Sequence, residues 1–92
     1  MMAQVQRFAG PTQFPFSSAT KADGLVYVSG TIVADGDIRN QTTKVLQSID
    51  ETLKKAGSSL AMAASVQVYI KNPSDFAAMN EVYRTFWKAD PP

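Results

Sequence analysis

The chain has 92 residues, a net charge of +1, and neither cysteine nor histidine. The two missing residue types exclude disulfides, thiolate and imidazole metal sites, a Ser-His-Asp triad and any nuclease built on paired histidines. The near-neutral charge does not favour nucleic acid, and no apolar run is long enough to cross a bilayer. We expect a single domain over residues 1–92, with no metal or cofactor, and a cytoplasmic location because no signal-like apolar segment begins the chain.

Short apolar runs in the first third of the chain predict three strands. Residues 4–9 alternate loosely between polar and apolar side chains and predict a first short strand. Residues 16–22 and 25–33 predict a hairpin, because an Asp-Gly pair stands between them and favours a tight turn between antiparallel strands.

Gly30 lies within the run 25–33, where glycine lowers the stability of a strand because it offers no side chain to pack. One interpretation is a bulge that bends the strand. The other is a ligand that approaches the backbone closely, with Ser29 offering a hydroxyl or a backbone group. The residues alone leave both open.

The middle of the chain predicts an amphipathic helix over residues 38–56. Asp37 is a suitable N-cap, and Gly57 is a suitable residue just past the end of the helix. Apolar residues recur at helical spacing: Ile38, Val45, Leu46, Ile49, Leu53 and Ala56. We expect this helix to bury one face.

A fourth strand and a second helix are predicted in the last third. Residues 64–71 alternate between polar and apolar side chains, as in a half-buried strand. Asn72 and Pro73 then favour a capped helix start. The apolar residues that follow have helical spacing: Phe76, Met79, Val82, Tyr83 and Phe86. The order of three strands, helix, strand and helix predicts an α+β fold whose helices cover one face of a sheet.

Four stretches of the sequence resemble the RidA/YjgF family of reactive-intermediate (imine and enamine) deaminases, which are also labelled endoribonuclease L-PSP. They are PFSSA at 15–19, LVYVSGT at 25–31, QTTKVLQSIDETLKKAGSSL at 41–60 and VQVYIKNPSDFAAMNEVYRTFW at 66–87. The resemblance extends over residues 4–92. It implies a chorismate-mutase-like βββαβα(ββ) fold, with two helices on one face and the last two strands absent from this chain. It also implies a homotrimer that binds small carboxylate-bearing ligands in clefts between subunits.

The resemblance assigns five ligand-binding candidates: Phe16, Ser29, Gly30, Thr31 and Asn80. Two of them depart from the pattern of the deaminase branch. Phe16 stands where that branch has a tyrosine, and Thr31 stands where it usually has a glutamine. The chain also ends at Pro92, before the arginine and glutamate that hold the substrate carboxylate and position water. No catalytic residue is therefore assigned.

Two functions remain open from the sequence. The first is a RidA-like protein that binds a small carboxylate-bearing ligand and is related to hydrolytic 2-imino and enamine acid deaminases. The alternative is a non-catalytic binding or interaction protein of the same fold, which Phe16 favours. A ribonuclease is disfavoured by the missing histidines and the near-neutral charge.

Asn80 and the aromatic residues of the second helix also have structural interpretations. Asn80 is more simply a structural amide than a ligand contact. Tyr83, Phe86 and Trp87 fit core and subunit contacts better than a platform for stacking nucleobases. Arg7 and Arg84 are the candidates to substitute for a missing carboxylate clamp, an alternative that the sequence does not favour.

Overall fold

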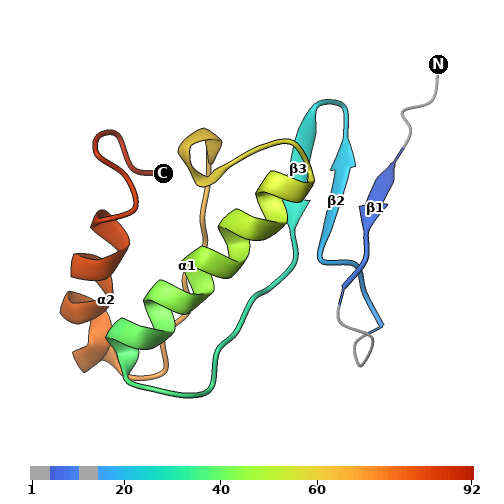
Figure 1. The fold of residues 1–92 in the computed structure, drawn as a ribbon. Coiled ribbons are helices and arrows are strands. Elements are labelled where there is room, and N and C mark those ends of the chain that lie inside the picture. The colour runs from blue at the N-terminus through green and yellow to red at the C-terminus, as the bar shows by residue number, and fades with distance from the viewer. Residues whose placement is uncertain (1–4, 11–14) are drawn as a thin grey trace.

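The structure is a computed structural model that describes residues 5–10 and 15–92. A three-stranded antiparallel sheet has the order β1-β2-β3, formed by Gln6–Phe8, Ala19–Ala22 and Leu25–Val28. The helices are α1, Ile38–Lys55, and α2, Phe76–Arg84. α1 lies between the sheet and α2 (Figure 1). The α+β prediction is confirmed. The first strand is shorter than predicted, and residue 4 of that prediction lies outside the described residues.

The predicted hairpin is confirmed, together with its turn. Asp23 and Gly24 both have positive φ angles, 52° and 78°, as the tight turn between right-twisted strands requires. Thr20 lies opposite Tyr27, and Lys21 lies opposite Val26. Val26 packs against the helix-covered core, so Tyr27 belongs to the opposite face of the sheet.

The third strand ends at Val28, so the prediction of a strand over residues 25–33 is wrong beyond that point. One further backbone bond continues the pairing, because the Ser29 amide donates to the Ser18 carbonyl at 3.0 Å. The Ser18 amide donates to Phe8 on β1 at 2.8 Å. Residues 15, 16 and 18 form bends, so among the described residues no strand lies beside Gly30 and the residues after it. Gly30 therefore follows the strand instead of lying within it.

The first helix has the predicted ends. Its N-cap is Asp37, whose side chain accepts a hydrogen bond from the Asn40 amide at 2.9 Å. Its last turn carries Lys54 and Lys55, and Gly57 follows with a φ of 84°. A capped start and a glycine just past the end are the signals that predicted this helix.

The start of the second helix differs from the prediction. A single 3-10 turn, η2 over Pro73–Asp75, leads into α2. Asn72 precedes that turn, but its side chain makes no capping hydrogen bond. Pro73 stands at the first position of the turn, where its missing N–H is not needed. The side chain of Phe76 is more than half exposed instead of buried.

The strand predicted over residues 64–71 does not form a ladder with any described strand. The segment leaves a second 3-10 turn, η1 over Leu60–Met62, and passes behind α1 to reach α2 (Figure 1). Alternation fits a strand only where a neighbouring strand can accept its hydrogen bonds.

The core lies where the sheet, α1 and the chain after α2 meet. Leu46, Leu53, Leu60 and Trp87 form its buried cluster. The Trp87 Nε1 donates to the Leu60 carbonyl at 2.8 Å, and the Trp87 ring lies 4.6 Å from that of Tyr83. The core positions predicted for these aromatic residues are confirmed.

Candidate functional site

Two hydrogen bonds join the end of β3 to the segment that precedes β2, and a third orders the end of β3 itself. The Ser29 hydroxyl donates to the Ser17 carbonyl at 2.5 Å, and the Ser29 amide donates to the Ser18 carbonyl at 3.0 Å. The Thr31 hydroxyl donates to the Ser29 carbonyl at 3.2 Å. Residues 16–18 and 29–31 thus lie side by side. We call these two segments the β3-end site. It contains four of the five predicted ligand-binding residues.

The chemistry of the β3-end site is neutral. Both hydroxyl protons are directed to backbone carbonyls, so Ser29 and Thr31 present oxygen lone pairs outward unless a ligand reorients a hydroxyl. None of their described hydrogen bonds involves a lysine or an arginine. Phe16 is about half exposed and contributes apolar surface. The site could hold a small molecule by hydrogen bonds and apolar contact, while a cation for a carboxylate would have to come from outside it.

The described residues give no internal reason for glycine at position 30. A Cβ atom built on Gly30 meets nothing within 4 Å. Its φ is not among the positive values found for Gly24, Gly36 and Gly57. The bulge interpretation loses its basis, because the ladder has already ended at Val28. The open space beside Gly30 is available to a ligand or to another subunit.

Gly10 supports the β3-end site, and the sequence analysis missed this role. A Cβ atom on Gly10 would lie 2.5 Å from the Phe16 carbonyl oxygen and 3.2 Å from the Ser18 amide nitrogen. Any side chain here would force residues 16–18 away from the end of β1. From the sequence, the Gly-Pro pair at 10–11 indicates only the end of a strand. The close approach of Gly10 to residues 16–18 can be recognised only in the tertiary structure.

The fifth predicted residue, Asn80, lies in a different place. It belongs to α2 and is half-buried in a groove of about 230 Å³, which we call the α2 groove. The other residues of this groove are apolar or aromatic: Val66, Val68, Phe76, Met79, Tyr83 and Pro92. α2 and the hairpin lie on opposite sides of α1 (Figure 1). Within one chain the structure does not bring Asn80 to the β3-end site.

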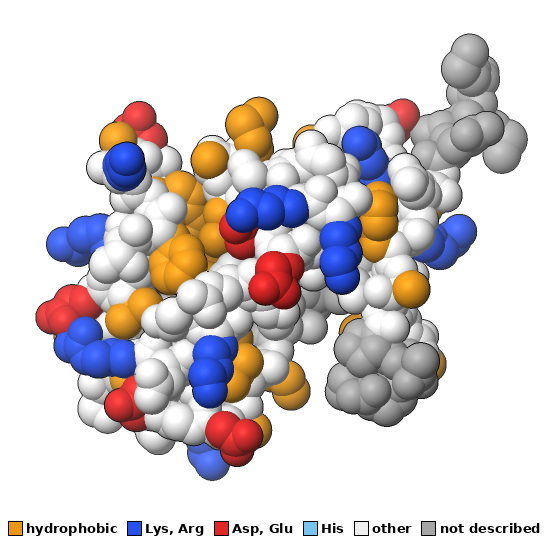
Figure 2. Space-filling view, in the orientation of Figure 1, with side chains coloured by type: hydrophobic (Ala, Val, Ile, Leu, Met, Phe, Trp, Pro, Cys, Tyr) orange, Lys and Arg blue, Asp and Glu red, His pale blue; other side chains and the backbone are white. Residues whose placement is uncertain are grey.

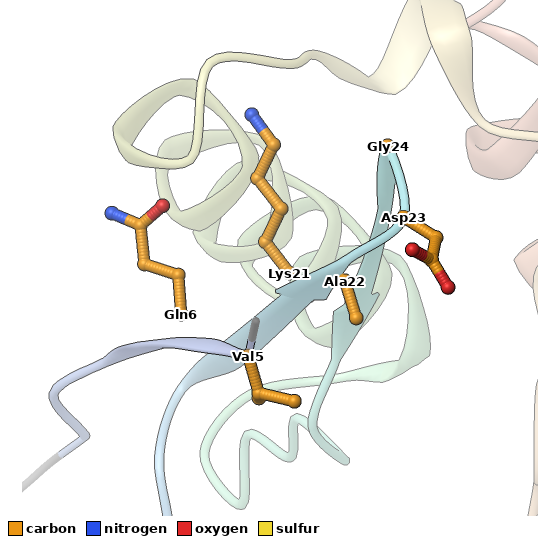
Figure 3. Close-up of a pocket in the computed structure, with 6 residues that line it drawn as sticks. All are labelled: Val5, Gln6, Lys21, Ala22, Asp23 and Gly24. Atoms are coloured by element: carbon orange, nitrogen blue, oxygen red, sulfur yellow. The ribbon is translucent and has the colours of Figure 1, made fainter. Parts of the chain in front are cut away.

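A larger hollow of about 460 Å³ lies beside the hairpin turn but contains none of the predicted residues. Figure 3 shows its lining, with the Lys21 and Asp23 side chains pointing in different directions. The Lys21 Nζ donates to the Ala56 carbonyl at 3.3 Å, at the C-terminal end of α1. A lysine there satisfies a free helix carbonyl and complements the helix dipole. We assign Lys21 this structural role and do not place the site in this hollow.

The perturbed titratable groups lie outside the β3-end site. The hydrogen bond from Lys54, followed by that from the Leu60 amide, lowers the pKa of the Asp50 carboxyl. Burial raises the pKa of the Tyr83 hydroxyl, which donates to the Pro92 carbonyl. Charges of both signs are scattered over the face in Figure 2 instead of forming a basic patch. The described residues contain no cluster of acidic side chains that could hold a metal ion.

A family profile and two related proteins agree on the family of this chain. The family profile of endoribonuclease L-PSP matches residues 9–92. The chain belongs to this family, known also as RidA/YjgF. Two RutC family proteins are 38% identical (Pyrococcus abyssi) and 40% identical (Pyrococcus horikoshii) to it over 86 residues, which cover 85% of this chain and 68% of each relative. The family prediction is thus confirmed.

Solved structures support the same fold. A YjgF family member from Neisseria meningitidis has a TM-score of 0.84 and 30% identity, covering 94% of this chain and 71% of its own. An uncharacterized protein from Pseudomonas aeruginosa has a TM-score of 0.79 and 27% identity, covering 89% and 71%.

The compartment of this RidA/YjgF chain stays a prediction. A mitochondrial protein of Schizosaccharomyces pombe, mmf1, is 39% identical over 75 residues and covers 75% of this chain and 46% of its own. The described part of the chain contains no helix that could span a membrane. The cytoplasmic location predicted from the sequence is not tested by these findings.

Proposed function

We propose that this RidA/YjgF chain binds a small carboxylate-bearing molecule at the β3-end site, in clefts between the subunits of a homotrimer. It would be related to the hydrolases that deaminate 2-imino and enamine acids. The observation that carries the proposal is the open space at Gly30, between the hydroxyl-bearing residues Ser29 and Thr31. Gly30 has no packing or conformational role within the described chain, so a contact from outside explains it.

The outer face of the hairpin supports a subunit contact. Leu25 and Tyr27 are each 57% exposed, and they stand on the face of β3 opposite to the one that packs on the core. Thr20 and Ala22 are their uncharged cross-strand neighbours on β2, and Arg7 on β1, opposite Thr20, is the charged residue on this face. Large exposed apolar side chains on adjacent positions are typical of a surface that a partner covers.

The residues of the β3-end site have separate roles in this proposal. Ser29 and Thr31 would accept or donate hydrogen bonds to the ligand, and Phe16 would contact its apolar part. A carboxylate in a dry cleft also needs a cation, which the hydrogen bonds of these residues do not supply. Asn80 would join the site only if a second subunit places its α2 groove there.

The alternative function is binding without catalysis. Phe16 favours it, because this side chain lacks the phenolic hydroxyl that the deaminase branch has at the corresponding position. Pyruvate binding would support both functions, whereas release of ammonia from a 2-imino acid would separate them.

Titration with pyruvate, the smallest 2-keto acid, tests the ligand site. We expect binding to the wild-type chain and at least a tenfold loss of affinity in Gly30→Leu, because the larger side chain fills the open space. Ala34→Leu is the matched control, since it enlarges an exposed residue of the same loop. Unchanged pyruvate affinity in a folded Gly30→Leu variant would overturn the proposed site.

Light scattering coupled to size exclusion tests the trimer. We expect a mass of three chains for the wild type and a smaller mass for Tyr27→Glu, which places a charge on the outer hairpin face. Lys44→Glu on the exposed side of α1 serves as the control and should leave the mass unchanged. A wild-type monomer at micromolar concentration would contradict the proposed assembly.

A further inference from the structure

The segment that precedes β2 is held against the end of β1 by two hydrogen bonds and one close approach. The Ser18 amide donates to the Phe8 carbonyl at 2.8 Å, and the Ser18 hydroxyl donates to the Ala9 carbonyl at 3.0 Å. Beside these bonds, a Cβ atom built on Gly10 would lie 2.5 Å from the Phe16 carbonyl oxygen. A backbone oxygen cannot move aside as the end of a long side chain can. Glycine at position 10 therefore lets the segment lie against β1.

The position of this segment determines the direction of the Ser29 hydroxyl proton. The Ser17 carbonyl oxygen can only accept a hydrogen bond, so the Ser29 hydroxyl donates to it at 2.5 Å. The Ser29 amide is held by the same segment, through the Ser18 carbonyl at 3.0 Å. Because its proton is directed to Ser17, the Ser29 oxygen presents only lone pairs to a ligand. The ligand group that meets this oxygen must then carry an O–H or N–H donor.

We propose that Gly10 is a positioning residue for the β3-end site, and that through Ser29 it sets the preference of the site for its ligand. By keeping residues 16–18 against β1, Gly10 keeps the Ser29 hydroxyl proton on the Ser17 carbonyl. The site then prefers small carboxylates with a hydrogen-bond donor at C2 to 2-keto acids, whose C2 oxygen can only accept. This inference rests on the proposed function, because it concerns the ligand of the same site.

Paired titrations with racemic lactate and with pyruvate test this preference. The two acids have the same carboxylate and the same chain length, and they differ at C2, where lactate has a hydroxyl and pyruvate has a keto oxygen. A cation supplied to the carboxylate acts on both acids, so its contribution cancels in the ratio of their affinities. We expect the wild type to bind lactate more tightly than pyruvate.

Gly10→Ala should lower the lactate-to-pyruvate ratio of affinities by about fivefold, within the range of one neutral hydrogen bond. The added methyl group pushes the Ser17 carbonyl away, so the Ser29 hydroxyl becomes free to donate to the keto oxygen of pyruvate. In a Ser29→Ala background the same Gly10→Ala change should leave the ratio unaltered, since the hydroxyl that Gly10 orients is gone.

Gly24→Ala is the matched control for a general loss of stability. It is the same substitution in the same sheet, and the φ of 78° at position 24 makes it destabilising as well. Among the described residues, a Cβ atom at position 24 meets nothing within 4 Å beyond its chain neighbours. Gly24→Ala should therefore leave the lactate-to-pyruvate ratio unchanged.

Amide exchange without ligand tests the positioning role separately. Gly10→Ala should speed the exchange of the Ser18 and Ser29 amides, because both hydrogen bonds depend on the place of the segment before β2. The paired amides of the β2–β3 hairpin should stay slow. Unchanged exchange at Ser18 and Ser29 would show that Gly10 does not hold this segment in place.

The titrations distinguish a failure of this inference from a failure of the proposed function. If the wild type binds both acids and Gly10→Ala leaves their ratio unchanged, the positioning role is wrong while the proposed function stands. A wild type that prefers pyruvate would refute the donor preference. Binding of neither acid to the wild type would refute the proposed function, and the ligand preference with it.

Ser18→Ala decides the question if Gly10→Ala does not fold. This variant removes the hydrogen bond to the Ala9 carbonyl without adding an atom near the segment. The lactate-to-pyruvate ratio should fall in the same direction as for Gly10→Ala, by a smaller factor. A folded Ser18→Ala variant with the wild-type ratio would contradict the proposal.

Discussion

The β2–β3 hairpin and the segment 64–71 both alternate between polar and apolar residues, yet only the hairpin forms strands. In the hairpin, Ala22 and Leu25 are paired across a two-residue turn, so each strand finds its partner at once. Residues 64–71 stand between two 3-10 turns and have no strand beside them among the described residues. The difference teaches that alternation specifies which side chains face inward, whereas the existence of a strand depends on a partner.

The largest expected loss of stability concerns the core contacts next to residues 64–71, a segment with no strand beside it among the described residues. Trp87 is 8% exposed, and its Nε1 donates to the Leu60 carbonyl, so it joins the chain after α2 to the 3-10 turn that precedes the segment. Trp87→Ala should lower the free energy of unfolding by about 3 to 5 kcal/mol, because it leaves a cavity and removes the indole hydrogen bond to the Leu60 carbonyl. Urea denaturation measures this loss. Tyr69→Ala, within the segment itself, should change it by no more than about 0.5 kcal/mol. Equal losses would mean that the segment is packed as firmly as the core.

A pair of glycine variants compares the turn of the hairpin with the end of β3. Gly24→Ala should cost about 1 to 2 kcal/mol, because position 24 has a φ of 78° that a side chain disfavours. Gly30→Ala should change stability by no more than about 0.5 kcal/mol, since its Cβ would lie in open space. Thermal denaturation gives both values. A comparable loss at position 30 would restore the bulge interpretation.

The helix that covers the hairpin provides a smaller test. Asp37→Ala removes the hydrogen bond to the Asn40 amide and should cost about 1 kcal/mol. Asp35→Ala is the control, because it changes an exposed carboxylate just before the cap. Urea denaturation should therefore distinguish two neighbouring aspartates. No difference between them would show that packing on the sheet, and not the cap, fixes the start of α1.

The smallest expected effect is a pH dependence of stability that comes from Asp50, which contacts the 3-10 turn before residues 64–71. The Asp50 carboxylate accepts from Lys54 and from the Leu60 amide, and these bonds lower its pKa in the folded chain. The contribution of Asp50 to the free energy of unfolding is therefore fully present above the pKa of an unfolded aspartate, about 3.9. It is lost as the pH falls through the lower pKa of Asp50 in the folded chain. The urea midpoint should fall over this acidic range by less in Asp50→Asn than in the wild type. Identical pH profiles of the urea midpoint in the two proteins would show that the hydrogen bonds of Asp50 do not stabilise the fold.

Local signals predicted the hairpin and the first helix, because the residues that determine them are close in sequence. Asp37, Gly57 and the Asp23-Gly24 pair each act on neighbouring backbone groups. The absence of pairing at 64–71 and the early end of β3 could not be predicted in this way, since each depends on which strand lies alongside. Phe76 was expected to be buried by its helical spacing, but the described chain leaves it 58% exposed.

The candidate site was predictable only in part. Gly30 stood out in the sequence because glycine is unusual within an apolar run, and it drew attention to the neighbouring Ser29. The structure places both beside residues 16–18. Asn80 was assigned by resemblance alone, and the structure places it in the α2 groove. Gly10 was missed because its close approach to Phe16 joins two segments that the sequence does not relate.

Residue-resolved amide exchange tests the central comparison most directly. It would be measured on the wild-type chain over a range of concentrations. The account predicts that the paired amides of β2 and β3 exchange slowly at every concentration, because their hydrogen bonds lie within one chain. It predicts that the amides of residues 64–71, which have no strand beside them among the described residues, exchange rapidly in the dilute chain. Slow exchange of residues 64–71 at the lowest concentration, or rapid exchange in the hairpin, would contradict the account.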